Sequence, residues 1–220
     1  MVDLLFSKFD QFLHANGFRA QKGQIVDANI VRVSTQRNTR EENKDIKDGK
    51  SISSWSTAKR RQKDTDARWT KKNGTSFFSY KNHVSIDVGH KLIRSYEVTD
   101  ASVHDSQVFT ELLDPSNTSR DVWADSAYRS ENSLIELKEQ GFREHIQRKG
   151  SRHKKLTTRE QPGTRSRARI RCRIEHVFGV MAMRNGSTVM RGIGIVRIRA
   201  KIGLRNIAYN MTRYAMLAGT

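Results

Sequence analysis

Three acidic residues that lie far apart in the chain are the strongest candidates for catalysis. Asp27 lies in an apolar run over residues 24–31, Asp125 ends a second run, and Glu175 lies inside an arginine-rich helical pattern. A carboxylate at the edge of a buried strand is costly unless a partner neutralises it. Carboxylate oxygens suit Mg²⁺ or Mn²⁺, and two such ions can promote an in-line displacement at phosphorus. The three acids therefore predict a metal site for phosphodiester chemistry.

The distribution of charge favours a polyanionic substrate. The chain has 220 residues and a formal net charge of +18. The first 142 residues hold 22 Lys and Arg against 20 Asp and Glu, residues 143–173 hold 12 against 2, and the remaining residues hold 7 against 1. The excess of basic residues therefore follows residue 142, a pattern typical of a nucleic-acid-binding surface.

Cysteine usage and hydropathy indicate the compartment. The single cysteine, Cys172, can form neither an intrachain disulfide nor a zinc finger. No apolar run approaches the ~18 residues of a membrane span, and Leu4-Leu5-Phe6 is too short for the apolar region of a signal peptide. We therefore expect a cytoplasmic protein that reaches the nucleoid and has no membrane partner.

The first third of the chain is expected to contain one helix, one strand and a long insertion. Residues 3–16 predict a helix with Leu5, Phe9, Phe12 and Leu13 on one side. The first strand is expected at about 24–33. A polar stretch over about 34–74 follows, which predicts a long loop or insertion with little core of its own.

A hairpin and alternating elements are expected to complete the fold. Apolar residues alternate with polar ones over 84–88, which predicts a strand, and Gly89-His90 would form a two-residue turn into a strand ending near residue 98. Helices are then expected from Asp105, after Ser130, and over 164–184 and 197–217, with strands at 122–124 and 144–147. This order predicts an α/β fold in which helices flank a mixed sheet and a helical extension ends the chain. It is also the element order of the ribonuclease H-like fold, which implies adjacent strands for Asp27 and Asp125.

Several blocks of sequence resemble one protein family. The blocks are residues 36–43, 62–72, Tyr80-Lys81-Asn82-His83, 98–106 and 123–130. Together they resemble bacterial insertion-sequence transposases of the DDE class, most closely the insertion-sequence-five group. The resemblance implies Mg²⁺-dependent cleavage and transfer of DNA strands, with Asp27, Asp125 and Glu175 as catalytic residues and metal ligands. It also implies two Mg²⁺ ions, for which Mn²⁺ can substitute: one activates water and later a DNA 3′-hydroxyl, and the other stabilises the leaving oxygen.

The resemblance implies partners and a domain division as well. Double-stranded DNA, as element ends and as target, is the expected substrate, and a homodimer on DNA is the expected assembly. Relatives carry a helical domain before the first catalytic strand, so we expect residues 1–19 to be a short helix left from such a domain. Residues 20–220 would form the catalytic domain with its insertion at about 34–74. The family's tyrosine and lysine near the glutamate are replaced by Ala168 and Ala182, whereas its arginine is present as Arg171.

Basic and aromatic residues are the candidate DNA contacts. The basic candidates are Arg129, Arg148, Lys149, Arg165, Arg167, Arg169 and Arg171. Closely spaced arginines with few local acids repel one another, and a DNA backbone would relieve that repulsion, although a solvated helix face is the alternative. Trp55 and Trp69 would either stack on an unpaired base or pack on the core.

Other assignments remain open at this point. Glu160 competes with Glu175 for the third acid, but we expect Glu160 in a loop with no rigid element to aim it. Asp105 is expected to cap a helix, and Asp64 and Asp66 are expected to form solvated salt bridges. Two further functions compete with the transposase: an inactive DNA-binding remnant of a mobile element, and a ribonuclease H-like nuclease without strand transfer.

Overall fold

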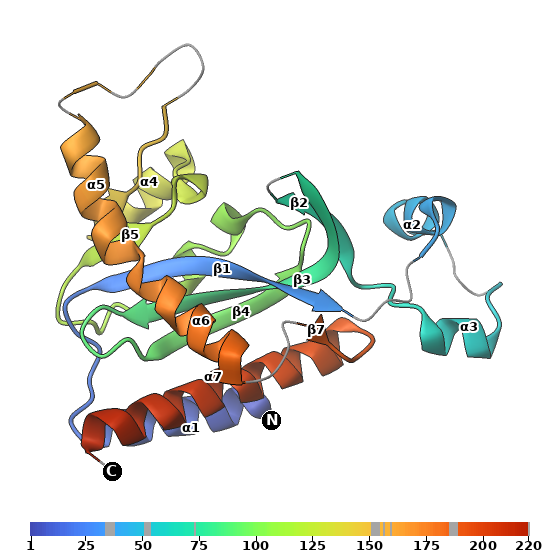
Figure 1. Ribbon diagram of the computed structural model, residues 1–220, viewed down its shortest axis with the longest axis horizontal. Coiled ribbons are helices and arrows are strands. Elements are labelled where there is room, and N and C mark those ends of the chain that lie inside the picture. Colours follow the sequence, from blue (N-terminus) through green and yellow to red (C-terminus); the bar gives the residue numbers. More distant parts are fainter. Residues whose placement is uncertain are drawn as a thin grey trace.

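Seven strands form one mixed sheet at the centre of the described chain (Figure 1). The computed structural model describes residues 1–33, 38–50, 54–72, 74–150, 155, 157–158, 160–184 and 189–219. The strands are β1 (Gln24–Val33), β2 (Arg68–Lys72), β3 (Thr75–Asp87), β4 (Ile93–Asp100), β5 (Asp121–Ala124), β6 (Arg143–Ile146) and β7 (Val189–Met190).

The pairing of the strands identifies the fold class. β1 is central and pairs antiparallel with β3 and parallel with β5. β4 pairs antiparallel with the other edge of β3, and β6 pairs parallel with β5. β2 pairs with the first part of β3, and β7 pairs with the end of β1. The order β4-β3-β1-β5-β6, with the last two strands parallel to β1, is that of the ribonuclease H-like fold. The predicted fold class is therefore confirmed.

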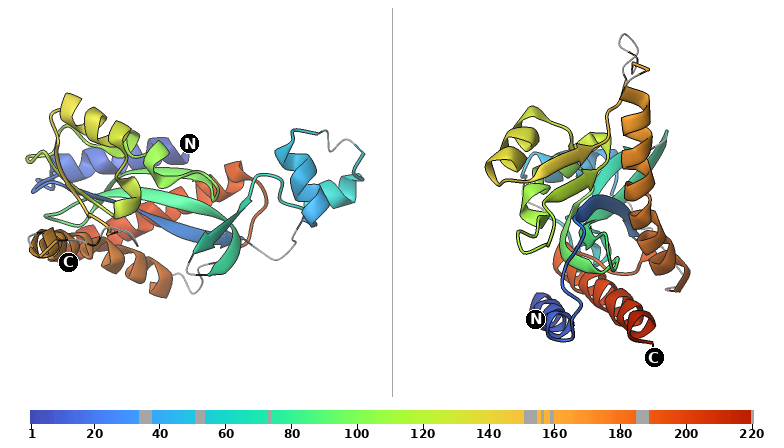
Figure 2. Two further views of the ribbon diagram at one scale, coloured as in Figure 1. Left: turned by 90° about the horizontal axis from the view of Figure 1, so that it is seen from above. Right: turned by 90° about the vertical axis from the view of Figure 1, so that its left-hand side faces the viewer.

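Helices cover both faces of the sheet because side chains alternate along β1. Ile25 packs on one face with Ile174 of α6 (Arg173–Arg184) and with residues of α1 (Val2–Ala15) and α7 (Ile195–Ala218). Val26 packs on the opposite face with Leu137 of α4 (Glu131–Glu139). The helix α7 is the expected C-terminal extension, and it lies beside α1 (Figures 1 and 2).

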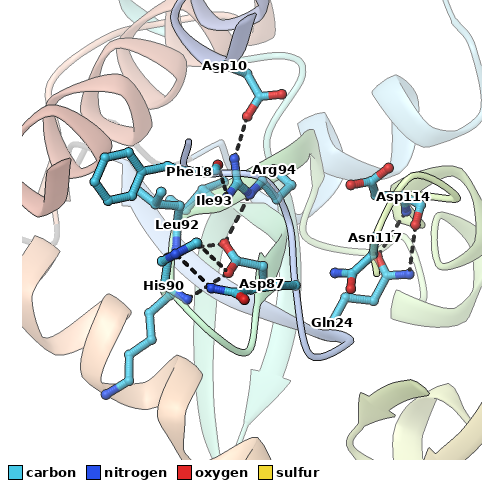
Figure 3. Close-up of polar contacts among 12 residues, drawn as sticks. Asp10, Phe18, Gln24, Asp87, His90, Leu92, Ile93, Arg94, Asp114 and Asn117 are labelled. Atoms are coloured by element: carbon cyan, nitrogen blue, oxygen red, sulfur yellow. Dashed lines mark hydrogen bonds and ion pairs between the residues drawn. The ribbon is translucent and has the colours of Figure 1, made fainter. Parts of the chain in front are cut away.

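A buried charged cluster fastens α1 to the sheet (Figure 3). The Arg94 guanidinium donates to Asp87 at 3.0 Å, to Asp10 of α1 at 2.9 Å and to the Phe18 carbonyl at 2.8 Å. Asp87 is fully buried, so removing its arginine partner would leave an uncompensated charge. The expected boundary between an N-terminal segment, residues 1–19, and a catalytic domain, residues 20–220, stays a prediction.

The apolar side of α1 differs from the predicted stripe. Leu13 is buried as expected, and Phe6 is buried although the predicted stripe omits it. Leu5 and Phe12, which the stripe includes, are exposed. The difference arises because the Tyr96 ring of β4 packs on Phe6 at 4.9 Å, whereas Phe12 makes only an edge contact with Tyr214 of α7, so tertiary packing selects a neighbouring face.

Several local predictions are wrong in detail. The hairpin turn is longer than two residues: Asp87 and Leu92 are hydrogen-bonded across a loop, in which Lys91 has the positive φ of 59°. Gly89 is needed there because a Cβ would lie 2.5 Å from the Gln21 side chain.

The helix expected from Asp105 is replaced by two short 3₁₀ helices, Asp105–Gln107 and Thr110–Leu112. The long helix expected over 164–184 is divided at Cys172 into α5 (Glu160–Arg171) and α6. Its expected end, residues 185–186, lies outside the described residues.

The insertion contains more structure than a loop. It forms α2 (Arg40–Lys47) and α3 (Thr57–Gln62), which project from the sheet, and then β2 (Figures 1 and 2). Glu42 forms ion pairs with Lys59 at 2.8 Å and with Lys63, and these pairs join the two helices. Residues 34–37, 51–53 and 73 of the expected insertion lie outside the described residues.

The two aspartates after α3 do not form the solvated salt bridges that were expected. Asp64 is buried and accepts hydrogen bonds from the Tyr80 hydroxyl at 2.7 Å and from the Ala67 amide at 3.0 Å. Asp66 accepts from the Ile195 amide at 2.8 Å. These carboxylates therefore hold the base of the insertion against the N-terminus of α7, where the helix dipole favours negative charge.

Candidate active site

The pairing of β1 with β5 brings two of the three predicted acids together. Val26 pairs with Ala124 in the parallel register; Asp27 follows Val26 on β1, and Asp125 directly follows the end of β5. Both aspartates line an open cavity of about 230 Å³ at the carboxyl end of β5. This is the end of a parallel pair at which α/β proteins place their sites. The cavity is also lined by Ala28, Ile30, Thr70, Lys71, Lys72, Lys81, Asp105, Ala127 and Tyr128.

The two aspartates have different surroundings. The Asp27 side chain is 18% exposed, and burial raises its pKa to about 6. The charge of Asp125 adds to that rise, whereas the Ala28 amide and Arg171 oppose it. Asp125 begins a 3₁₀ helix, Ser126–Tyr128, and accepts from the Ala127 amide at 2.8 Å and from the Ser126 hydroxyl at 3.0 Å. Because the charge of Asp125 raises the pKa of Asp27, a cation bound between these two carboxylates would be favourable.

Glu175 is linked to the aspartates through an arginine. Arg171 donates to Asp27 at 2.9 Å and to Glu175 at 2.6 Å. Arg171 is the last residue of α5 and Glu175 lies in the first turn of α6. The two bonded residues therefore lie on either side of the break between these helices at Cys172. Glu175 itself is 59% exposed and does not line the cavity. The third acid is therefore near the pair, with Arg171 between them.

The buried stripe that holds α6 agrees with the predicted one. Ile174, Val177 and Met181 are buried, and Phe178 packs against the same cluster. Their spacing repeats at three and four residues, which fixes the rotation of the helix about its axis. That rotation turns Glu175 away from the core and toward Arg171.

The oxygen atoms at the cavity suit a hard divalent cation. Asp27 and Asp125 supply carboxylate oxygens, and the Tyr128 hydroxyl is buried without a hydrogen-bond partner among the described residues. Burial raises the pKa of Tyr128 well above its usual range, and the charges of Asp27, Asp105 and Asp125 act in the same direction. Within the described residues no three acidic, histidine or cysteine side chains are already assembled as a metal-binding group. The residues fit a cation in their chemistry, and Glu175 would join them only after separating from Arg171.

The basic candidates fall into paired and exposed groups. Arg129 forms an ion pair with Glu144 and Arg148 one with Glu160, both at 3.0 Å. Arg171 is held by the acids described above. The exposed candidates are Lys149, Arg165 and Arg169, and Arg167 is half-buried. No acid among the described residues pairs with Arg165, Arg167 or Arg169.

The competing acid, Glu160, has a structural role. It begins α5 instead of lying in a loop, and it accepts from the Thr157 amide at 3.0 Å. Its side chain forms an ion pair with Arg148 and does not line the cavity. The two tryptophans also have partners: the Lys59 ammonium lies 4.5 Å from the Trp55 ring centre, and Trp69, 40% exposed, lies 5.5 Å from the Phe78 ring.

Sequence reasoning did not identify Asp105 as a residue of this cavity. Asp105 does not cap the following turn, because the His104 side chain accepts from the Ser106 amide instead. Asp105 forms an ion pair with Lys81 at 2.7 Å, and both residues line the cavity with Tyr128. The available signal was that Lys81, Asp105 and Tyr128 all lie in the blocks that carried the family resemblance.

Comparison with known proteins identifies the family. The transposase DDE domain family matches residues 19–211 of this chain. The chain belongs to this family. It is 27% identical over 215 residues to the transposase for insertion sequence element IS1106 from Neisseria meningitidis serogroup B, an alignment that covers 96% of this chain and 72% of that protein. No solved structure matches the chain.

The match to the transposase DDE domain family confirms the predicted class of protein, a DDE transposase of an insertion sequence. DDE transposases are enzymes that act on DNA, and the family generally uses divalent metal ions. The insertion-sequence-five group stays a prediction. Among the described residues, no helix is both long enough and apolar enough to cross a membrane.

Proposed function

We propose that this chain cleaves DNA at the ends of an insertion sequence and joins those ends to a target, with Asp27, Asp125 and Glu175 as its catalytic acids. The observation that carries the proposal is the parallel register of β1 and β5, which places Asp27 beside Asp125 at one cavity of a DDE transposase domain. Residues 20–220 would form the catalytic domain, against which the helix within residues 1–19 packs.

Asp27 and Asp125 would hold the divalent cation, and Glu175 would complete the set. Two Mg²⁺ ions, or Mn²⁺ in their place, would polarise the phosphodiester and favour ionisation of the attacking hydroxyl. Tyr128 would donate its unpaired hydroxyl hydrogen into the cavity, where it can orient a water or a phosphate oxygen. Arg171 would exchange its carboxylate partners for phosphate oxygens when DNA occupies the site.

The exposed basic residues would hold the DNA backbone. Arg165 and Arg169 extend from α5, and Lys149 lies on the segment that precedes it. Such contacts position DNA and carry no sequence information. Arg129 and Arg148 would contribute after release from their acids, and Trp69 would stack on an unpaired base at a cut end. Because an element has two ends, we propose that a homodimer assembles on the DNA.

A cleavage and joining assay tests the proposed function. The substrate is duplex DNA that carries the genomic segments flanking this reading frame, together with a supercoiled target plasmid. We expect cut ends and joined product with Mg²⁺ or Mn²⁺, and neither with EDTA. Cut DNA without joined product would indicate a nuclease, and DNA binding without either product would indicate an inactive remnant.

A further inference from the structure

A lysine on β3 lies at the same cavity as the catalytic aspartates. Lys81 donates from its ammonium to Asp105 and to the Val103 carbonyl, both at 2.7 Å. The Lys81 side chain is only 13% exposed, and Lys81 and Asp105 both line the cavity. An ammonium has three N–H donors. Two of them are occupied, so the third is left for a ligand in the cavity.

Among the described residues, Lys81 is the cation that neutralises Asp105, because the nearby His83 is neutral. His83 is fully buried, and its Nδ1 lies 3.9 Å from Asp105. Burial lowers the pKa of His83 to about 4, so this imidazole is neutral at pH 7. Its other nitrogen is 2.9 Å from the Thr99 hydroxyl. The described residues therefore give Asp105 one positively charged partner, and that partner is Lys81.

A phosphate that enters this cavity meets two carboxylates, so it needs cations as well. Arg171 is neutralised by Asp27 and Glu175 on one side of the site. Lys81 is held by one carboxylate and lines the same cavity as Asp27 and Asp125, so its remaining donor is available to a ligand bound beside them. A compact ammonium suits a single phosphate oxygen, which it binds as a point charge.

We propose that Lys81 is a further catalytic residue, which binds a non-bridging oxygen of the scissile phosphodiester and is positioned by Asp105 and the Val103 carbonyl. The inference rests on the proposed function, because it names the substrate atom at that site. The ammonium keeps its proton throughout. The bond from phosphorus to the attacking oxygen forms while the bond to the leaving 3′ oxygen breaks, and Lys81 stabilises the negative charge on the remaining oxygens.

A purely structural role for the Lys81–Asp105 pair makes a different prediction. If the pair only stabilises the packing of β3 against the 103–105 segment, removing both charges together should restore whatever one substitution loses. If Lys81 binds phosphate, the double substitution should restore stability without restoring activity. The two roles can therefore be separated with a single set of variants.

The test compares Lys81→Met, Lys81→Met with Asp105→Asn, and the matched control Lys138→Met, which removes a lysine exposed on α4. With the flanking-segment duplex and Mg²⁺, we expect Lys81→Met to cleave about 100-fold more slowly at saturating DNA, as for loss of one transition-state donor. The double variant should unfold near the wild-type temperature and remain about as slow. Lys138→Met should cleave like the wild type. Wild-type cleavage by the double variant would overturn the proposal.

A binding measurement keeps the inference separate from the proposed function. The affinity for the same duplex is measured with Ca²⁺ in place of Mg²⁺ over a range of salt concentrations. Loss of one phosphate contact lowers the slope of log affinity against log salt by about 0.9. We expect that change for Lys81→Met and for the double variant, and none for Lys138→Met. An unchanged slope in the double variant would overturn the phosphate contact of Lys81, even if the wild type cuts DNA. If the variants show the expected slopes but the wild type never cuts DNA, only the proposed activity is refuted.

Discussion

The cavity beside β1 and the basic helix α5 use charge in opposite ways. In the cavity, Asp27 is paired with Arg171 and Lys81 with Asp105, and all four side chains are at least three-quarters shielded from solvent. On α5, Arg165 and Arg169 are exposed, and no acid among the described residues pairs with them. Fixed, shielded charges can act on a defined atom, whereas exposed charges attract any phosphate backbone. Under the proposed function, the cavity would therefore be the place of chemistry and α5 a place of DNA binding.

The largest expected effect comes from removing a carboxylate of the cavity. Asp125→Ala should reduce cleavage of the flanking-segment duplex by at least about 10³-fold, because it removes a ligand of the proposed metal site. Its affinity for the duplex should stay within about twofold of the wild type, since α5 is unchanged. Cleavage gels and fluorescence anisotropy measure the two quantities. A loss of affinity equal to the loss of cleavage would contradict the separation of the two regions.

The converse substitution on α5 should weaken binding. Replacing Arg165, Arg167 and Arg169 together with Gln should lower affinity about 100-fold at 0.1 M salt and flatten the salt slope by about 2.7, as for three lost phosphate contacts. Cleavage at saturating DNA should remain close to that of the wild type. The matched control replaces the exposed Lys8 and Lys138 with Gln, which should leave the slope unchanged. An unchanged slope in the triple variant would show that α5 is a solvated face.

Acid pH should lower the free energy of unfolding through protonation of the buried His83. The pKa of His83 is about 4 in the folded protein and 6.5 when unperturbed, so the unfolded chain binds the proton more readily. Its contribution to stability is therefore complete above pH 6.5 and is lost as the pH falls toward 4. Between pH 7.5 and pH 5 the loss amounts to about 2 kcal/mol.

Urea unfolding of two variants isolates this effect from other titrating groups. The stability difference between the wild type and His83→Gln should shrink by about 2 kcal/mol from pH 7.5 to pH 5, because the variant cannot titrate. The same comparison with His176→Gln, which removes an exposed histidine of α6, should show little change. A constant difference for His83→Gln would mean that this imidazole is already protonated, or solvated, in the folded protein.

The smallest effect is expected for the acid of α5. Glu160→Gln removes a surface ion pair with Arg148, and such an exposed pair contributes little to stability. Cleavage should be unchanged, whereas Glu175→Gln should reduce it strongly. Measuring both variants in one cleavage assay distinguishes the two acids. A Glu160→Gln variant that fails to cleave while Glu175→Gln cleaves normally would reverse their assignment.

The order of the elements could be predicted because the sheet leaves strong local signals. Alternating residues over 84–88, the apolar run before Asp125 and the caps at Ser130 are properties of short segments. The strand order then followed from a resemblance to a known fold, and with it the adjacency of Asp27 and Asp125. The first helix of the insertion, α2, could have been anticipated, because Thr39 and Glu42 have the spacing of a capping box and form one in the structure.

The contacts that complete the site could not be predicted from local patterns. Lys81 and Asp105 are 24 residues apart, and Arg171 and Asp27 are 144 apart, so their pairing depends on the finished fold. The burial of Asp64 has the same origin, because its partner Tyr80 belongs to another element. Composition assigned arginines 165–171 to one basic region, but Arg171 is paired with the acids, Arg167 is half-buried, and Arg165 and Arg169 are exposed.

The most direct test of the central claim is to measure Mn²⁺ binding to the protein on duplex DNA. Electron paramagnetic resonance would count bound Mn²⁺ for the wild type and for a variant with Asp27→Asn and Asp125→Asn, each saturated with the same flanking-segment duplex. The parallel register of β1 and β5 predicts that the wild type binds Mn²⁺ and that the double variant loses it while retaining its affinity for DNA. Equal Mn²⁺ binding by both proteins would contradict a catalytic metal site at the end of these two strands.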